Sequence, residues 1–173
     1  MSVLSAESRR DFEIHRYPVL VYALVPLAAL ILQAWLPRAL GRYAWFDLPL
    51  VVTVFFALSR RNPIQGSLMG GSMGIFEDAL THHALGINGI AKTLVGYLAA
   101  SIGMLVNVES HTIRLLLTFL LSLVGSATYF FVYRFLLGMA IESSWLAELY
   151  KAIGNSLIAL LLFPMLDRTK IRD

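Results

Sequence analysis

Three charged side chains set among apolar residues are the strongest candidates for chemistry. Glu77 and Asp78 end a glycine-rich stretch, and Lys92 lies within the apolar stretch that follows. A carboxylate at the centre of a bilayer costs about 2.5–3.5 kcal/mol on insertion scales, and less toward the interface, so such a charge needs a partner. We therefore expect Asp78 or Glu77 to form an ion pair with Lys92 that joins the two stretches. A proton or substrate relay is the alternative role for these residues.

Small residues line one face of the stretch that ends at Asp78. The residues that recur every four positions, and so share a helix face, are Gly66, Gly70, Gly74 and Asp78. Gly71 widens this face by one position. Each glycine weakens an isolated helix by about 1 kcal/mol, so three in register indicate the close approach of a neighbouring backbone. We expect packing within the chain; a partner-protein interface and a substrate cavity are the alternatives.

Other patterns that could indicate a metal or nucleotide site are weak. Asp78 and His82 have a metal-ligand spacing, but His82 and His83 fall at a predicted helix end, and the other histidines are predicted near the opposite membrane face. Residues 86–93 nearly match a phosphate-binding loop, but Ala91 replaces the second glycine and no strand precedes it. The sequence contains no cysteine and neither a G-x-S-x-G nor an H-E-x-x-H motif. We therefore predict no metal, no cofactor and no enzymatic activity.

The composition indicates that most of the chain lies in lipid. The 173 residues are 58% hydrophobic and 14% charged, and the mean hydropathy is +0.71. Soluble domains are usually about 45–50% apolar and about 25% charged, so this chain has too few charges to cover a soluble surface. That excludes most classes of soluble enzyme. The net charge of +3 does not indicate nucleic-acid binding, because the basic residues flank apolar runs as lipid-headgroup anchors do.

Six apolar stretches predict six membrane-spanning helices in a single domain. A span needs about 20 residues, with about 17–25 tolerated. The predicted spans are 17–36, 44–58, 63–80, 87–106, 113–137 and 146–166. Asp47 is expected to cap the second helix, while Pro37 should close the first and Pro164 should break the last. We therefore predict an all-α domain over 17–167, between a polar tail over 1–16 and a tail over 168–173.

The basic residues predict the orientation of these spans. One set of tails and connections contains Arg9, Arg10, Arg16, Arg60, Arg61, Arg114, Arg168, Lys170 and Arg172. The opposite connections contain Arg38 and Arg42. Because cytoplasmic segments carry the excess of Lys and Arg, both termini are predicted to be cytoplasmic. Trp35, Trp45 and Trp145 would then lie near the outer interface. We expect the first helix to stay in the membrane rather than to be cleaved as a signal peptide.

The region from residue 47 to residue 101 resembles the family of the bacterial rod shape-determining protein MreD. The matching features, in order, are an apolar helix, the basic turn at 59–61, Gly66 through Gly74 ending at Asp78, the step Leu85-Gly86 and the pair Gly96-Tyr97. The resemblance implies a non-catalytic component of the cell-elongation machinery in the bacterial inner membrane. It implies binding to MreC, and through MreC to MreB filaments and peptidoglycan synthases. The glycine face and Asp78, with Gly86, Gly96 and Tyr97, would serve the fold or the MreC contact.

The fold implied by this resemblance also supplies an alternative function. It is a compact six-helix bundle, similar to the substrate-binding subunits of energy-coupling-factor vitamin transporters. Such a subunit would need a polar cavity, for which Asp78, Asn88, Lys92 and Asn155 are the candidates. Fold alone does not decide between a scaffold and a transporter subunit. An intramembrane enzyme of unrecognised type is a third alternative.

Overall fold

The computed structural model describes residues 17–40, 46–81, 84–106, 108, 110–138 and 144–170. Within these ranges the chain is all-helical, which confirms the all-α part of the predicted fold class. The helices are α1 (Val19–Leu40), α2 (Leu48–Arg60), α3 (Pro63–Thr81), α4 (Ile87–Leu105), α5 (His111–Phe131) and α6 (Trp145–Asp167). A π-helical turn, η1 (Val132–Leu136), continues α5. The predicted tail over 1–16, together with Trp45, His82 and His83, lies outside the described residues.

Two of the predicted helix ends differ from the structure. Helix α1 continues through Pro37 to Leu40, and α6 continues past Pro164 to Asp167. Proline removes one backbone N–H and one hydrogen bond, but the helical bonds on either side of it can persist. An apolar surrounding favours that outcome, because the helix satisfies backbone groups that would otherwise have no partner. The two prolines were therefore wrongly predicted to close or break their helices.

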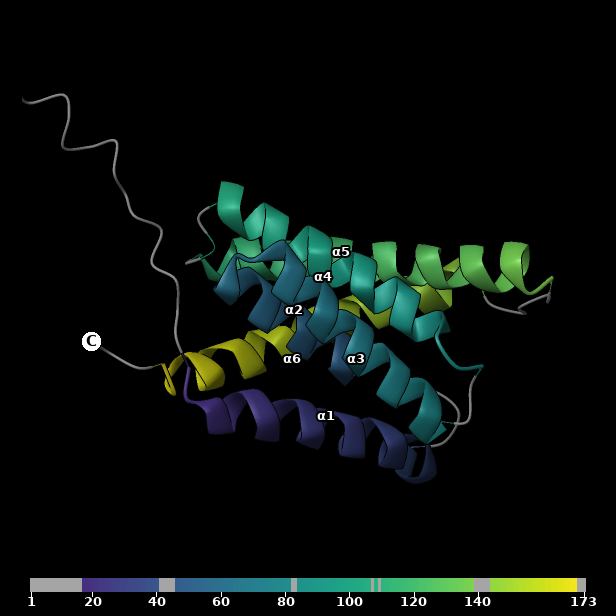
Figure 1. The fold of residues 1–173 in the computed structure, drawn as a ribbon, viewed down its shortest axis with the longest axis horizontal. Coiled ribbons are helices and arrows are strands. Elements are labelled where there is room, and N and C mark those ends of the chain that lie inside the picture. The colour runs from purple at the N-terminus through teal and green to yellow at the C-terminus, as the bar shows by residue number, and fades with distance from the viewer. Residues whose placement is uncertain are drawn as a thin grey trace, which may run out of the picture.

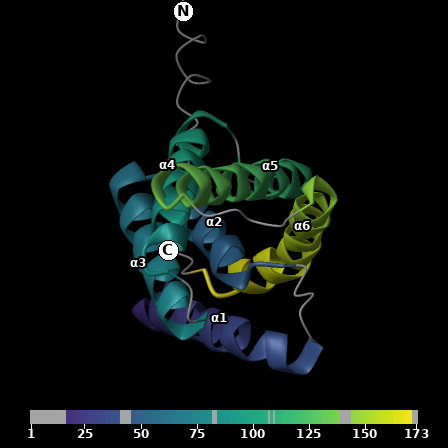
Figure 2. The ribbon, with the colours of Figure 1, turned by 90° about the vertical axis from the view of Figure 1, so that its right-hand side faces the viewer.

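Helix α2 forms the centre of the bundle. All of its residues from Pro49 to Ser59 are buried, and it packs against α1, α3, α4, α5 and α6. Figure 2 shows the other helices arranged around it. A helix that is apolar on every side is suited to a core position. With 13 residues, α2 is about 20 Å long, so its neighbours extend beyond it.

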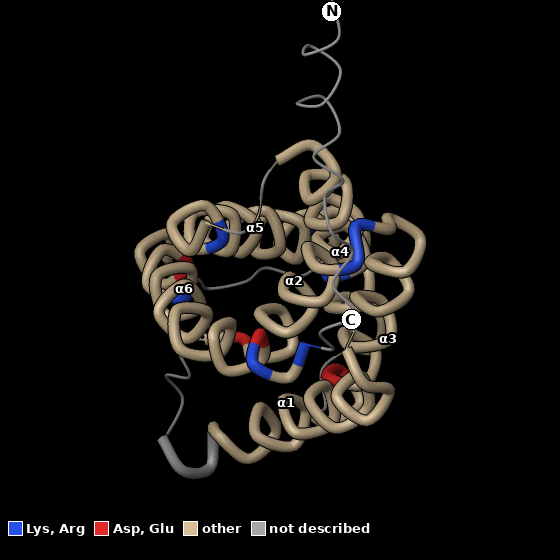
Figure 3. Tube along the Cα trace, turned by 90° about the vertical axis from the view of Figure 1, so that its left-hand side faces the viewer, with Lys and Arg blue, Asp and Glu red and all other residues tan. Residues whose placement is uncertain are grey.

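The helices run back and forth, so the bundle has two distinct ends (Figure 1). At one end Asp167 joins the start of α1 to the end of α6, since the Tyr17 hydroxyl donates to its Oδ1 at 3.1 Å. Arg114, at the start of α5, lies 2.5 Å from Oδ2 of the same carboxylate. Figure 3 looks onto this end, where Lys and Arg gather. We call it the basic end and define it by Arg60, Arg61, Arg114, Arg168 and Lys170.

Among the residues that the structure describes, three helical stretches are long and apolar enough to cross a membrane. They are Val19–Leu36 in α1, His111–Leu136 in α5 with η1, and Trp145–Asp167 in α6. In the most apolar 18 residues of each stretch, only 11% of the residues are buried in α1 and 28% in each of the other two. An apolar surface this extensive is suited to lipid rather than water. The structure is therefore consistent with a membrane protein.

Candidate functional site: a buried charged cluster and a glycine interface

Lys92 is the centre of a buried charged cluster. Its side chain is 1% exposed, and its Nζ lies 2.8 Å from Oδ2 of Asp47 and 2.6 Å from Oε2 of Glu77. Asp47 precedes α2, Glu77 is on α3 and Lys92 is on α4. Removing charges from water is costly, and close opposite charges with good geometry offset that cost. The cluster therefore ties three helices together at one point.

Asp47 extends the cluster to the last two helices. Its Oδ1 accepts a hydrogen bond from the Leu50 N–H at 2.9 Å, which confirms the predicted N-cap of α2. Its own N–H donates to Oδ1 of Asn155 on α6 at 2.6 Å. The Asn155 amide in turn donates to the Ser122 hydroxyl on α5 at 3.0 Å. Lys151 of α6 brings a second cation within 3.9 Å of the Asp47 carboxylate.

Asp78 has a separate role from Glu77. Its carboxylate is fully buried and accepts hydrogen bonds from the N–H groups of Gly86 and Asn88 at 2.8 and 3.1 Å. It also accepts from the Asn88 side-chain amide at 2.7 Å. These donors lie at the start of α4, where backbone N–H groups lack helical partners and the helix dipole favours a negative charge. Asp78 thus caps α4, whereas Glu77 pairs with Lys92.

The sequence left open which carboxylate pairs with Lys92 and placed only Asp78 on the inward face. The structure buries both, with Glu77 7% exposed and Asp78 fully covered. Adjacent residues can both be covered because α3 packs against α2 and α4. Sequence reasoning also missed Asp47 as a partner of Lys92. An acidic residue at the start of the most buried helix was the available signal.

The glycines of α3 bring its backbone against that of α4. A Cβ at Gly70 would overlap the carbonyl oxygen of Lys92, and a Cβ at Gly74 would overlap that of Asn88. A Cβ at Gly66 would overlap the carbonyl oxygen of Gly96, and one at Gly96 would overlap that of Gly66. We call this contact the glycine interface. Its neighbouring backbone belongs to this chain, because α4 occupies the face that the spacing of glycines marked.

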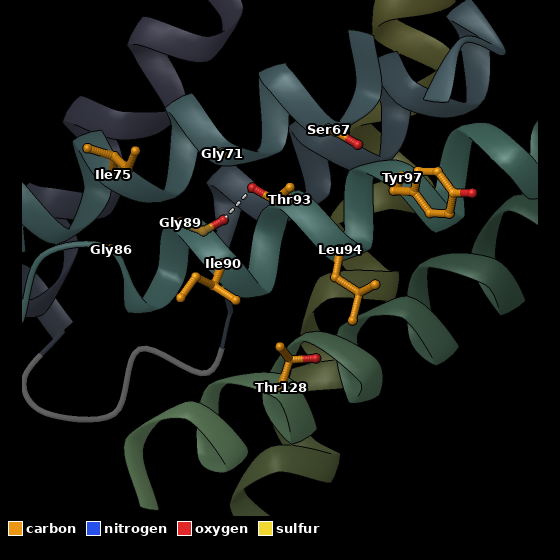
Figure 4. Close-up of a pocket in the computed structure, with 10 residues that line it drawn as sticks. All are labelled: Ser67, Gly71, Ile75, Gly86, Gly89, Ile90, Thr93, Leu94, Tyr97 and Thr128. Atoms are coloured by element: carbon orange, nitrogen blue, oxygen red, sulfur yellow. Dashed lines mark hydrogen bonds between the residues drawn. The ribbon is translucent and has the colours of Figure 1, made fainter. Parts of the chain in front are cut away.

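The remaining predicted site residues lie beside the glycine interface. Gly86 occupies the N-cap position of α4 with a φ of 98°, a conformation that glycine adopts at little cost. Gly71 and Tyr97 line an outer groove of about 710 Å³ between α3 and α4 (Figure 4). In this groove the Thr93 hydroxyl donates to the Gly89 carbonyl at 2.7 Å, and Tyr97 is half-exposed. These residues are therefore accessible from the outside of the bundle, unlike the charged cluster.

The described residues contain no group of three or more His, Asp and Glu side chains placed to hold a metal ion. Asp47 and Glu77 instead both pair with Lys92 inside the bundle. The arrangement can fix helices in place, and it offers no exposed nucleophile or base. The chain matches no protein-family model, no curated protein and no solved structure.

Proposed function

We propose that this chain is a non-catalytic scaffold of the bacterial cell-elongation complex, related to MreD and binding MreC. The observation that supports the proposal is the way in which the helices of the region resembling MreD pack together. Its glycine-rich helix and the helix after it pack together through the glycine interface, and its apolar helix packs against both. The aspartate that ends the glycine-rich helix, Asp78, caps the next helix. The matching features thus belong to one structural unit, as expected of a family motif.

The burial and pairing of the charged side chains support a scaffold rather than an enzyme. Lys92 and Asp47 have side chains 1% and 4% exposed, and they contact each other. An active site needs titratable groups that a substrate can reach. A scaffold needs a fixed arrangement of helices that presents a constant outer surface. The charged cluster helps to fix the helices in this way, because its contacts reach five of the six described helices.

For the membrane arrangement, we propose that all six helices lie in the bacterial inner membrane. The apolar surfaces of α1, α5 and α6 would face lipid, and the shorter α2 would remain in the core. The basic end would face the cytoplasm, because cytoplasmic segments carry the excess of Lys and Arg. Both termini would then be cytoplasmic, on the side where MreB filaments lie. Peptidoglycan synthases would be reached through MreC.

The geometry favours this scaffold over the transporter alternative. The four polar residues available to bind a substrate already bind other groups of the chain. Asp78 accepts from Asn88, and Asn155 bonds the Asp47 backbone and Ser122. Lys92 is paired with carboxylates. A substrate would have to break these buried contacts, so they support a structural role.

Depletion of the chain in its native bacterium tests the proposal. We expect rod-shaped cells to become round and side-wall peptidoglycan synthesis to lose its pattern, measured by microscopy with a fluorescent D-amino acid. Re-expression of the unaltered chain should restore both. Unchanged cell shape together with loss of vitamin uptake would contradict the scaffold and support the transporter subunit.

A further inference from the structure

A second groove lies between α1, α2 and α3 near the basic end of the bundle. Its volume is about 630 Å³, within the usual range for small-molecule sites. Its apolar walls include Pro26 of α1, Phe56 of α2, and Leu68 and Met69 of α3. Leu68 is 69% exposed, so the groove is continuous with the outer surface. An apolar chain entering from the surrounding lipid could lie along it.

A cation lies at one end of this groove. The guanidinium carbon of Arg60 is 4.5 Å from the centre of the Tyr22 ring, and both residues line the groove. Within the described part of the chain, no carboxylate forms a salt bridge with Arg60. The buried Tyr22 hydroxyl makes no hydrogen bond of regular geometry to the described residues. A guanidinium has five N–H donors, so Arg60 retains donors for an anion.

The groove and its cation match the two parts of one kind of ligand. We propose that it binds an anionic phospholipid, with the phosphate at Arg60 and one acyl chain along α3. The lining of α3 runs from Gln65 to Met73, which is about 12 Å of helix. The rest of the basic end would add attraction for an anionic headgroup. This inference rests on the proposed membrane location.

The outer groove of Figure 4 lacks this combination. It is lined by small and apolar residues such as Gly71, Gly89 and Leu94, and its described lining contains no charged side chain. Nothing there would favour an anionic headgroup over a neutral one. The charge of Arg60 therefore distinguishes the two grooves and assigns the lipid to the one between α1 and α3.

Native mass spectrometry of the purified full-length chain tests this site. The chain is titrated with phosphatidylglycerol and with phosphatidylcholine of identical acyl chains. We expect a Kd about tenfold lower for phosphatidylglycerol, because a charge-assisted hydrogen bond to Arg60 is available to its phosphate without a competing choline cation. Arg60→Gln should reduce this preference to about twofold or less. Arg60→Lys should keep the preference, which shows that the loss follows the charge rather than a folding defect.

Two further variants distinguish lipid binding in the groove from a general attraction of anionic lipid to the basic end. Ser72→Leu adds volume to the lining and should weaken the binding of both lipids. Arg168→Gln removes a charge at the same end but outside the groove, and it should lower the preference much less than Arg60→Gln does. An unchanged preference in Arg60→Gln, or an equal loss in Arg168→Gln, would overturn the site. Displacement of the lipid by inorganic phosphate alone would also overturn it, because the acyl chain would then contribute nothing.

The failure of this site can be distinguished from the failure of the proposed function. The titration uses the isolated chain, so its result does not depend on MreC. Equal affinities for the two lipids, in a chain that floats with phosphatidylglycerol vesicles, would overturn the lipid site alone. A chain that does not associate with such vesicles would overturn the membrane location, and the lipid site with it.

Discussion

Lys92 is the residue whose replacement should destabilise the interior of the bundle most. Its ammonium group is the only described cation within 3 Å of either Asp47 or Glu77, and all three side chains are buried. Replacing it with Met, which has a similar volume, leaves Glu77 without its ion-pair partner and Asp47 with only the more distant Lys151. We expect Lys92→Met to lower the free energy of unfolding by about 3–5 kcal/mol. Denaturation of the detergent-solubilised chain with increasing SDS, followed by circular dichroism, measures this loss.

Lys151 provides the matched control for that variant. Its ammonium lies 3.9 Å from the Asp47 carboxylate, but its side chain is 34% exposed. Water and counter-ions screen an exposed pair, so Lys151→Met should cost less than about 1 kcal/mol. Equal losses of unfolding free energy in Lys92→Met and Lys151→Met would mean that burial does not determine how much an ion pair of the cluster stabilises the chain.

Replacing Asp78 should destabilise the chain more than replacing Glu77, its neighbour on α3. Asp78→Ala leaves three donors at the start of α4 without their acceptor, which costs at least about 1–3 kcal/mol. Glu77→Gln leaves Lys92 paired with Asp47, so its effect should be smaller. Thermal unfolding of both variants, with Asp78→Asn as an intermediate, measures the order. A larger loss for Glu77→Gln would contradict the assignment of Asp78 as the cap.

At the scale of the element, the contact between α3 and α4 depends on the absence of side chains. A Cβ at Gly70 would overlap the Lys92 carbonyl oxygen, which belongs to the backbone and cannot rotate away. Gly70→Ala should therefore destabilise the chain by at least about 1–3 kcal/mol, and Gly70→Leu should prevent folding. Size-exclusion chromatography and thermal unfolding measure both effects.

Gly71 supplies a control one position away on the same helix. A Cβ there would lie 2.7 Å from Oγ1 of Thr93, the end of a side chain that can change rotamer. Gly71→Ala should change stability by less than about 1 kcal/mol, because the gain in helix propensity offsets part of the contact. If Gly70→Ala proved as mild as Gly71→Ala, the glycine interface would not be a close backbone contact.

The sequence predicted the elements better than their partners. Apolar runs located the six helices, and Asp47 was correctly predicted to cap the second, because these signals are local. The four-residue spacing of the glycines also marked the face that α4 occupies. Glu77 was one of the two predicted partners of Lys92. The second partner, Asp47, could not be predicted, since it lies 45 residues away and its distance from Lys92 depends on how α2 packs. The link from Asp47 to Asn155 spans 108 residues and depends on the whole bundle.

At the scale of the whole molecule, the proposed orientation can be tested directly. The chain has no cysteine, so single cysteines can be introduced without background. Leu85, between α3 and α4, and Thr169, at the basic end, lie at opposite ends of the bundle and are exposed. In spheroplasts, Leu85→Cys should react with a membrane-impermeant maleimide, and Thr169→Cys should react only after permeabilisation. The reverse pattern would contradict a cytoplasmic basic end.

The proposed scaffold role requires that this bundle associate with MreC. Affinity purification of the tagged chain from its native membranes, followed by mass spectrometry, measures that association. A tagged Gly70→Leu chain is the control for capture that does not depend on the folded bundle. We predict recovery of MreC together with peptidoglycan synthases by the unaltered chain. Recovery of a pair of ATPases and a coupling membrane protein, without MreC, would contradict the scaffold role.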